Sequence, residues 1–403
     1  MKKLILIVGL LLLISISLSA DDIMRPEEIT LEQFANEYIP DYTLKKRIPL
    51  ECREVGAFAV AKDTGNIVAI TQELIADTHK LQTVVNYFDI DGNLLWKKSI
   101  EGIYSITCAI TDNGELITAY GHFDKHSCNS KSIVLSNKGD ILCTKVFDRA
   151  GVVPSPDGKY LYLNRGESDS KEAKGFKLFD KNFEQVNVTG FDFNNLNNIH
   201  FTFVSDNNIL MYAYDTINSL PCYYLLQINQ DNNITLLWKY EIEKPYKNYP
   251  SYFYDDVKVH KDKMIINTLY SPVYVFNFVG DLLYKDNEIH FNFVDFIDSN
   301  TVFLMRPALN SKTINLETKE IDEKSAPYRG GGAVLKDIYC EGQYLLFSLK
   351  DILNIINNNN WNHRERLLYS LDKITKNSKE YYIFVKFGFS GNPEIVIYER
   401  SSK

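Results

Sequence analysis

The sequence lacks any long apolar stretch beyond its first residues. A short basic start (MKK) precedes an unbroken apolar run from Leu4 to Ile14, and small residues follow at Ser19 and Ala20. The run is short for a bilayer span and has the form of a secretory signal. This pattern predicts a signal peptide over residues 1–20, with an uncleaved membrane anchor as the alternative. We therefore expect an exported chain, periplasmic or extracellular, without a transmembrane domain after cleavage.

Closely spaced cysteines are also lacking. No cysteine follows the apolar run, which argues against a lipoprotein anchor, and no CxxC pair indicates a metal site. Disulfides are permitted in an exported chain. The six cysteines are widely spaced along the chain, which leaves two interpretations open: they are buried free thiols, or they form one or two disulfides. They are Cys52, Cys108, Cys128, Cys143, Cys222 and Cys340.

Basic residues are in deficit. The chain has 44 Lys and Arg against 52 Asp and Glu, for a net charge of −8. Binding to phosphates needs a basic surface, so we expect no nucleic-acid partner. Helical periodicity is nearly absent as well, which disfavours a helical solenoid.

Turn signals between β-rich apolar runs are frequent. In DIDGN, residues 89–93, Asp-Gly between apolar runs predicts a hairpin. A calcium loop is excluded because its sixth and twelfth positions, counted from Asp89, hold Leu94 and Ile100 instead of Gly and Glu. Two series of turns alternate along the chain. The first lies at Gly65, Gly114, Gly158, Asn207, Asp262, Asn300 and Gly342, and the second at Gly92, Gly139, Asn182, Asn232, Gly280, Thr318 and Gly391.

Two hairpins per repeat give four strands per repeat, which is typical of a β-propeller. We predict an all-β fold of four-stranded blades, six or seven in number, since seven hairpin pairs are present. Residues 84–90 and 265–270 are nearly continuous in apolar or aromatic residues. That composition fits a blade that packs on its neighbours through both faces.

Two segments depart from this pattern. Residues 21–47 are polar, and we expect them to form an N-terminal extension that packs across the propeller, in which TLEQFANEY is a helix. We expect residues 48–403 to form the propeller. Apolar residues recur at helical spacing between Ile352 and Ile356 and between Leu367 and Leu371. They predict a short helical insert in the last blade, at about residues 349–376.

Two stretches resemble the six-bladed β-propeller family of exported, Bacteroidota-like bacterial proteins. IPLECREVGAFAVAKDTGNIVAI, residues 48–70, resembles the first blade of that family, and GNPEIVIYERSSK, residues 391–403, resembles its terminal strand. The resemblance covers residues 45–403 and implies a propeller fold and an exported location. The family is largely uncharacterised, so no reaction is implied. This chain lacks the lipoprotein cysteine of many relatives and has seven hairpin pairs where the family name implies six blades.

The densest set of candidate metal ligands is GHFDKHSC, residues 121–128. His122, Asp124, His126 and Cys128 alternate, so they project the same way from an extended chain and are of types that bind zinc. The alternative is a polar connection between strands. Alternate residues of a strand lie about 6.5–7 Å apart, whereas zinc ligands lie about 2.0–2.3 Å from the ion. We therefore expect no bound transition metal, and no cofactor.

Signals of catalysis are scarce. No Gly-x-Ser-x-Gly elbow is present, and Gly330–Gly332 lacks the Gly-Lys-Ser/Thr ending of a nucleotide loop. Vicinal cysteines and repeated tryptophan docking motifs, as in quinone-dependent propeller dehydrogenases, are also missing. We expect a monomeric, non-catalytic binding or protein-interaction module with a protein, peptide or carbohydrate ligand. The alternative is a propeller enzyme of lactonase, lyase or hydrolase type, with a site at the central funnel.

Overall fold

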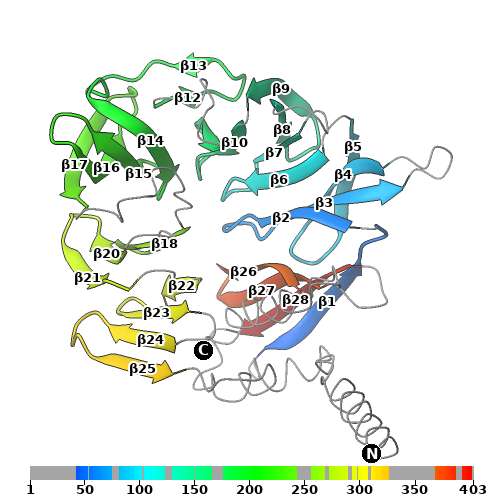
Figure 1. Cartoon of the computed structure of the whole chain (residues 1–403). Helices are drawn as coiled ribbons and strands as arrows, with labels where there is room; N and C mark the ends of the chain where they lie inside the picture. The colour runs from blue at the N-terminus through cyan, green and yellow to red at the C-terminus, as the bar shows by residue number, and fades with distance from the viewer. Residues whose placement is uncertain are drawn as a thin grey trace, which may run out of the picture.

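A computed structural model describes residues 42–401, except 53, 75–80, 102–103, 123–128, 149, 166–175, 243–255, 268–271, 289–292, 297, 307–309, 326–367 and 387–392. The described residues form 28 strands in seven four-stranded antiparallel sheets. The sheets are arranged around a common centre as the blades of a propeller (Figure 1). The predicted fold is confirmed, and the number of blades is seven.

Each blade is a meander whose strands follow one another in the sheet, except in the last blade. Blade 1 contains β2 (Glu54–Val60), β3 (Ile67–Leu74), β4 (Leu81–Phe88) and β5 (Leu94–Ile100). Blade 2 contains β6 (Tyr104–Ile110), β7 (Leu116–His122), β8 (Asn129–Ser136) and β9 (Ile141–Asp148). Blade 3 contains β10 (Ala150–Pro154), β11 (Leu161–Arg165), β12 (Leu178–Phe179) and β13 (Gln185–Val186). Blade 4 contains β14 (Leu196–Phe203), β15 (Asn208–Asp215), β16 (Leu220–Ile228) and β17 (Ile234–Glu241).

The remaining blades come from the last part of the chain and from its first described strand. Blade 5 contains β18 (Asp256–His260), β19 (Lys263–Asn267), β20 (Val273–Asn277) and β21 (Leu282–Asp286). Blade 6 contains β22 (Phe293–Phe296), β23 (Thr301–Arg306), β24 (Asn310–Asn315) and β25 (Ile321–Ser325). Blade 7 contains β26 (Leu368–Lys376), β27 (Lys379–Lys386), β28 (Glu394–Ser401) and β1 (Thr43–Pro49).

The core lies between the blades. Ile265 and Ile266 are consecutive residues of β19, and both are fully buried. Ile266 packs with Tyr223 of blade 4, whereas Ile265 packs with Leu304 of blade 6. Both faces of the sheet are therefore apolar, which explains why middle strands are continuous runs of apolar residues instead of alternating ones.

The turns within blades define one face of the disc. The first and second strands of a blade are joined by an inner turn, near the centre, and the third and fourth by an outer turn. In an antiparallel meander both turns lie at the same end of the sheet. We call this end the turn face, and the opposite end, where second strands connect to third strands and one blade connects to the next, the connection face.

On the turn face, the outer turn of a blade contacts the outermost strand of the preceding blade in two places. Trp96 of β5 donates its indole N–H to the carbonyl oxygen of Asn137 in the outer turn of blade 2, at 2.8 Å. Trp238 of β17 lies against Gly280 in the outer turn of blade 5, where a Cβ atom would come within 2.8 Å of the indole. Two of the three tryptophans thus do dock on the next blade, although the sequence shows no repeated docking motif.

Four outer strands contain a β-bulge, whose extra residue is the second residue of β5, β9 and β21 and the fourth residue of β17. In blade 1, Tyr87 pairs with Trp96 and Phe88 pairs with Leu94, so Leu95 is the extra residue. Blades 2, 4 and 5 repeat the arrangement, with Leu142, Leu237 and Leu283 as the extra residues. Bulges bend an edge strand and disfavour its pairing with another chain.

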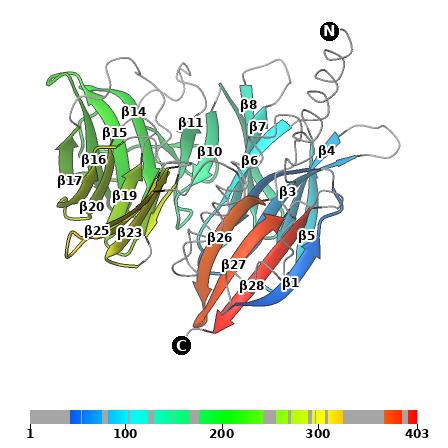
Figure 2. The same cartoon turned by 60° about the horizontal axis from the view of Figure 1, so that its bottom comes forward.

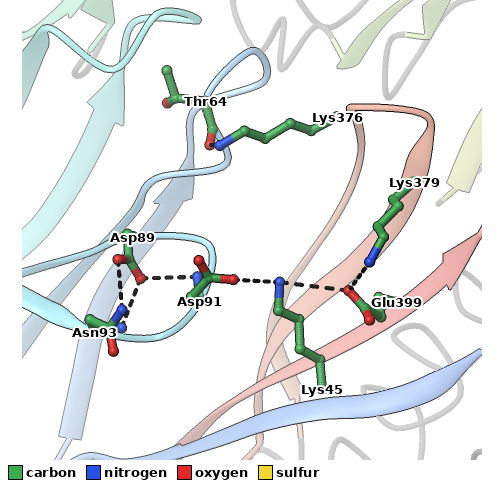
Figure 3. A network of polar contacts seen from close by, with 8 residues as sticks. All are labelled: Lys45, Thr64, Asp89, Asp91, Asn93, Lys376, Lys379 and Glu399. Atoms are coloured by element: carbon green, nitrogen blue, oxygen red, sulfur yellow. Dashed lines mark hydrogen bonds and ion pairs between the residues drawn. The ribbon is translucent and has the colours of Figure 1, made fainter.

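The ring is closed by β1, which pairs with β28 and supplies the outermost strand of blade 7 (Figure 2). Figure 3 shows the polar contacts at this junction. Lys45 of β1 lies 2.7 Å from Asp91 in the outer turn of blade 1, and Lys376 donates to the carbonyl oxygen of Thr64 in the inner turn of blade 1. Asp89 in turn accepts the backbone N–H groups of Asp91 and Asn93, which fixes the turn.

Twelve of the predicted turns lie where the sequence placed them, and the two turns of the seventh pair fall on residues outside the described part. The hairpin of blade 7 turns at Asn377 and Ser378, both with positive φ. Residues 342 and 391 lie outside the described part. The predicted helical insert was wrong for Leu368–Lys376, which form β26, and the predicted extension to residue 47 includes the start of β1. The rest of the insert and of the extension lies outside the described residues.

Four cysteines are described, and none of them forms a disulfide. Cys222 is buried, while Cys52, Cys108 and Cys143 are half-buried. Cys128 and Cys340 lie outside the described residues. Within the described ranges, no helix is long and apolar enough to cross a membrane.

Candidate functional site

The inner turns of the turn face are linked to one another by their backbones. The N–H of Asp63 donates to the carbonyl oxygen of Asp112, at 2.9 Å, and the N–H of Asp112 donates to that of Pro156, at 2.8 Å. Blades 1, 2 and 3 are thereby joined on the turn face. Asp206 belongs to the inner turn of blade 4.

The carboxylates of these turns influence one another. Burial raises the pKa of Asp112, Lys62 opposes the rise, and the charges of Asp63 and Asp206 add to it. Among the described residues, no group of three or more His, Cys, Asp or Glu side chains is arranged to hold a metal ion.

Blade 4 has an ion pair at the connection face. Lys239 of β17 donates to Asp215, the last residue of β15, at 2.8 Å. This hydrogen bond, with those from the backbone and side chain of Asn218, lowers the pKa of Asp215 to about 2. Burial raises the pKa of the neighbouring Cys222 thiol. The lysine is charged and the thiol protonated at neutral pH, so this cluster contains no activated nucleophile.

A second cluster joins blades 5 and 6. Lys312 of β24 contacts Asp286 at 2.9 Å and Glu288 at 3.0 Å, and Tyr284 donates to the same Asp286 oxygen at 2.8 Å. Burial lowers the pKa of Lys312, but the hydrogen bonds to the two carboxylates outweigh it and the pKa is raised. Burial and the bond to Asp286 raise the pKa of Tyr284. Both groups stay protonated, and the cluster is an inter-blade contact.

A cluster of phenylalanines lies between blades 3 and 4. The Phe176 ring is 4.7 Å from that of Phe193 and 4.4 Å from that of Phe201, and Phe191 is 4.8 Å from Phe193. These four rings, which we call the aromatic cluster, are only half-buried against the core. The reason is local, because β12 and β13 contain two residues each and leave the outer part of blade 3 thin.

The backbone holds the aromatic cluster in place. Asp192 accepts the N–H of Asn194 at 2.9 Å, and Thr216 donates both its N–H and its hydroxyl to the carbonyl oxygen of Asn195. The amides of this segment are exposed beside the rings: Asn194, Asn195, Asn197 and Asn198. Fixed apolar rings flanked by exposed amides are the surface that a ligand-binding site needs.

The sequence reasoning missed this cluster. A hairpin was predicted at Asn182, but no site was predicted in residues 176–203, although they contain seven phenylalanines. That density was the available signal. The half-exposed state of the aromatic cluster depends on how short the outer strands of blade 3 are, and the local sequence does not predict that length.

Of the four candidate metal ligands, the structure describes His122 alone. His122 ends β7, and its backbone pairs with Ser130 and Tyr104. Asp124, His126 and Cys128 lie outside the described residues, as do Gly330–Gly332. The expectation of no bound metal stays a prediction.

No family model and no curated protein matches the chain. Similar solved structures include BamB from Moraxella catarrhalis, with 10% identity and a TM-score of 0.46 over 89% of this chain and 99% of that one. The β-propeller domain of the Trilobed protease from Pyrococcus furiosus has 10% identity and a TM-score of 0.44, over 89% and 96%. The WD40 β-propeller domain of Doa1 has 10% identity and a TM-score of 0.42, over the same shares. Similarities this distant give no information on function.

Proposed function

We propose that this chain is an exported, non-catalytic binding module that uses its propeller as a rigid frame and contacts a peptide, protein or carbohydrate at the aromatic cluster. One observation carries the proposal, namely four half-buried phenylalanines fixed beside exposed amides where blade 3 is thin. Rings of this kind supply large contact areas at a small cost in conformational entropy. Function on a propeller is grafted onto such local surfaces.

The two charged clusters support the same proposal. Lys239, Lys312 and Tyr284 have raised pKa values, and Asp215 has a lowered one, so each keeps its ordinary protonation state at neutral pH. A general acid or base works best with a pKa near the operating pH. These groups instead stabilise contacts between strands and blades. The alternative of an enzyme at the central funnel therefore has to rely on other residues.

The test is a binding assay with matched variants. Arrays of peptides and glycans identify a ligand, and its affinity is then measured for wild type, for Phe176→Ser with Phe193→Ser, and for the control Phe278→Ser. Phe278 is a half-buried ring of blade 5 on the turn face. We expect the double variant to lose at least about tenfold in affinity, as for removal of an aromatic hot spot, and the control to retain it.

Circular dichroism and the melting temperature show whether each variant is folded. Equal loss of affinity in the folded control and double variant would contradict the proposed site. Turnover of a lactone or ester by wild type would favour the enzyme. Export is tested separately, by N-terminal sequencing of chain secreted from a bacterial host, where cleavage at residue 19 or 20 is expected.

A further inference from the structure

The outer wall of blades 7, 1 and 2 contains exposed aliphatic side chains along one arc. Each is between 43% and 51% exposed, although its strand also contributes a buried residue to the core, namely Ile48, Ile100 or Phe147. Five of them occur near the turn face, at the beginning of the outermost strands β1, β5 and β9, and the sixth lies farther along β9. The arc consists of Leu44, Leu94, Leu95, Ile141, Leu142 and Val146.

The three strands of this arc are contiguous in space. Lys45 of β1 contacts Asp91 in the turn that leads into β5. Lys98 of β5 donates to the carbonyl oxygen of Gly139, at 2.6 Å, in the turn that leads into β9. The aliphatic side chains therefore lie on the outermost strands of three successive blades, and the series ends at blade 3, where the outermost strand is only Gln185–Val186.

The arc is also basic. Its strands β1, β5 and β9 carry six basic residues and one acidic residue. A second set of exposed aliphatic residues lies on blades 4, 5 and 6, but its strands β17, β21 and β25 carry three basic and four acidic residues. Three basic residues of the first arc pair with neighbouring acids, namely Lys45 with Asp91, Arg47 with Glu394 and Lys97 with Glu73. Ion pairs near the surface contribute little to stability.

The segment that precedes β1 has the complementary chemistry. Residues 21–41 contain seven acidic residues and one basic residue. Leu31, Phe34, Ala35 and Tyr38 follow helical spacing, and Thr30 with Gln33 has the pattern of a capping box. The segment ends beside Tyr42, whose hydroxyl donates to Glu380 at 2.6 Å, next to Leu44 of the arc.

We propose that residues 21–41 dock on the basic aliphatic arc of blades 7, 1 and 2 as an amphipathic helix, so that the chain covers its own exposed surface. With residues 31–38 helical at about 1.5 Å per residue and residues 38–43 extended at about 3.4 Å per residue, the segment reaches about 28 Å from Thr43. Packed sheets are about 10 Å apart, so the segment reaches β5 and β9. The acidic segment should prefer this arc, because its strands carry more basic than acidic residues, whereas the strands of blades 4–6 do not. The proposal does not depend on the proposed ligand site.

The test places a photo-crosslinking residue, p-benzoylphenylalanine, at position 34 of the full chain and maps the products by mass spectrometry. We expect crosslinks within one chain to residues 94–98 or 141–146. The matched control carries the probe at Gln33, on the opposite side of the predicted helix, and should lose most of that yield. Crosslinks to blades 4–6, crosslinks only between two chains, or none at all would overturn the proposal.

Charge variants provide an independent measurement. Lys97→Glu with Lys145→Glu should reduce the crosslink yield from position 34, and adding Glu32→Lys with Glu37→Lys should restore it. Lys285→Glu, at the corresponding place of the second arc, is the control and should leave the yield unchanged. Only variants whose melting temperature equals that of wild type are compared. An unchanged yield in the folded Lys97 and Lys145 variant would also contradict the proposal.

Discussion

Trp96 and Trp238 occupy the same place in their blades but use the indole N–H differently. That of Trp96 donates to the carbonyl oxygen of Asn137, whereas that of Trp238 is buried and has no hydrogen-bond partner among the described residues. Both rings stack on an aromatic residue of the same or the next blade, Tyr87 and Phe276 respectively. The two residues thus form a natural pair for separating packing from hydrogen bonding.

Replacing each tryptophan with phenylalanine should therefore have unequal effects. We expect Trp96→Phe to lower the free energy of unfolding by about 1–2 kcal/mol, because a carbonyl loses its donor. Trp238→Phe removes an unsatisfied polar group together with some packing, so we expect a change of less than about 1 kcal/mol. Urea denaturation of both variants checks this. A larger cost at position 238 would contradict it.

Asp215 makes stability depend on acid pH. Its pKa is about 2 in the folded chain, because of the hydrogen bond from Lys239, against about 3.9 for an unfolded aspartate. A lowered pKa contributes stability that is complete above the unfolded value and is lost as the pH falls through the folded one. The contribution should be constant above pH ~4 and absent below pH ~2.

This dependence is measurable as a difference of melting temperatures. Wild type should exceed Asp215→Asn at pH 5–7, and the gap should close as the pH falls to about 2. Asp262→Asn is the control, since Asp262 is exposed and lies 3.9 Å from Lys263. A gap that persists unchanged at pH 2 would exclude Asp215 as its source.

At the level of elements, the bulge of β5 protects an edge strand. Deleting Leu95 preserves the pairs Tyr87 with Trp96 and Phe88 with Leu94, but makes the strand regular. A regular edge is a better template for pairing with another chain. We expect the deletion variant to fold and to self-associate at high concentration, as sedimentation velocity would show. Leu95→Ala, which keeps the bulge, is the control and should remain monomeric.

Turns were predictable because their signals are local. Gly65, Gly92 and Gly114 all adopt positive φ in the structure, the conformation for which glycine is favoured. The blade 7 hairpin escaped prediction because it turns at Asn377 and Ser378, without a glycine. The apolar residues of its first strand fit a helical as well as a strand period, and only the pairing of β26 with β27 selects the strand. The aromatic cluster could not be predicted, because its exposure depends on strands elsewhere in blade 3.

For the whole molecule, closure of the ring depends on β28, which lies between β1 and β27. Deleting residues 392–403 removes the partner of β1 and exposes the edge of β27. We expect insoluble or unfolded protein, because unpaired edges invite aggregation. Removing only Ser402 and Lys403, which follow β28, is the control. A soluble deletion variant with a cooperative melting transition would show that β28 is dispensable.

The pairing of β1 with β28 also has a consequence for synthesis. About 350 residues separate the two strands, and ribosomes add about 5–20 residues per second. The first strand to emerge must wait about 20–70 s for its partner, while six blades are completed in order behind it. The last blade can therefore form only after β28 has been synthesised, and until then the nascent chain stays open at the seam.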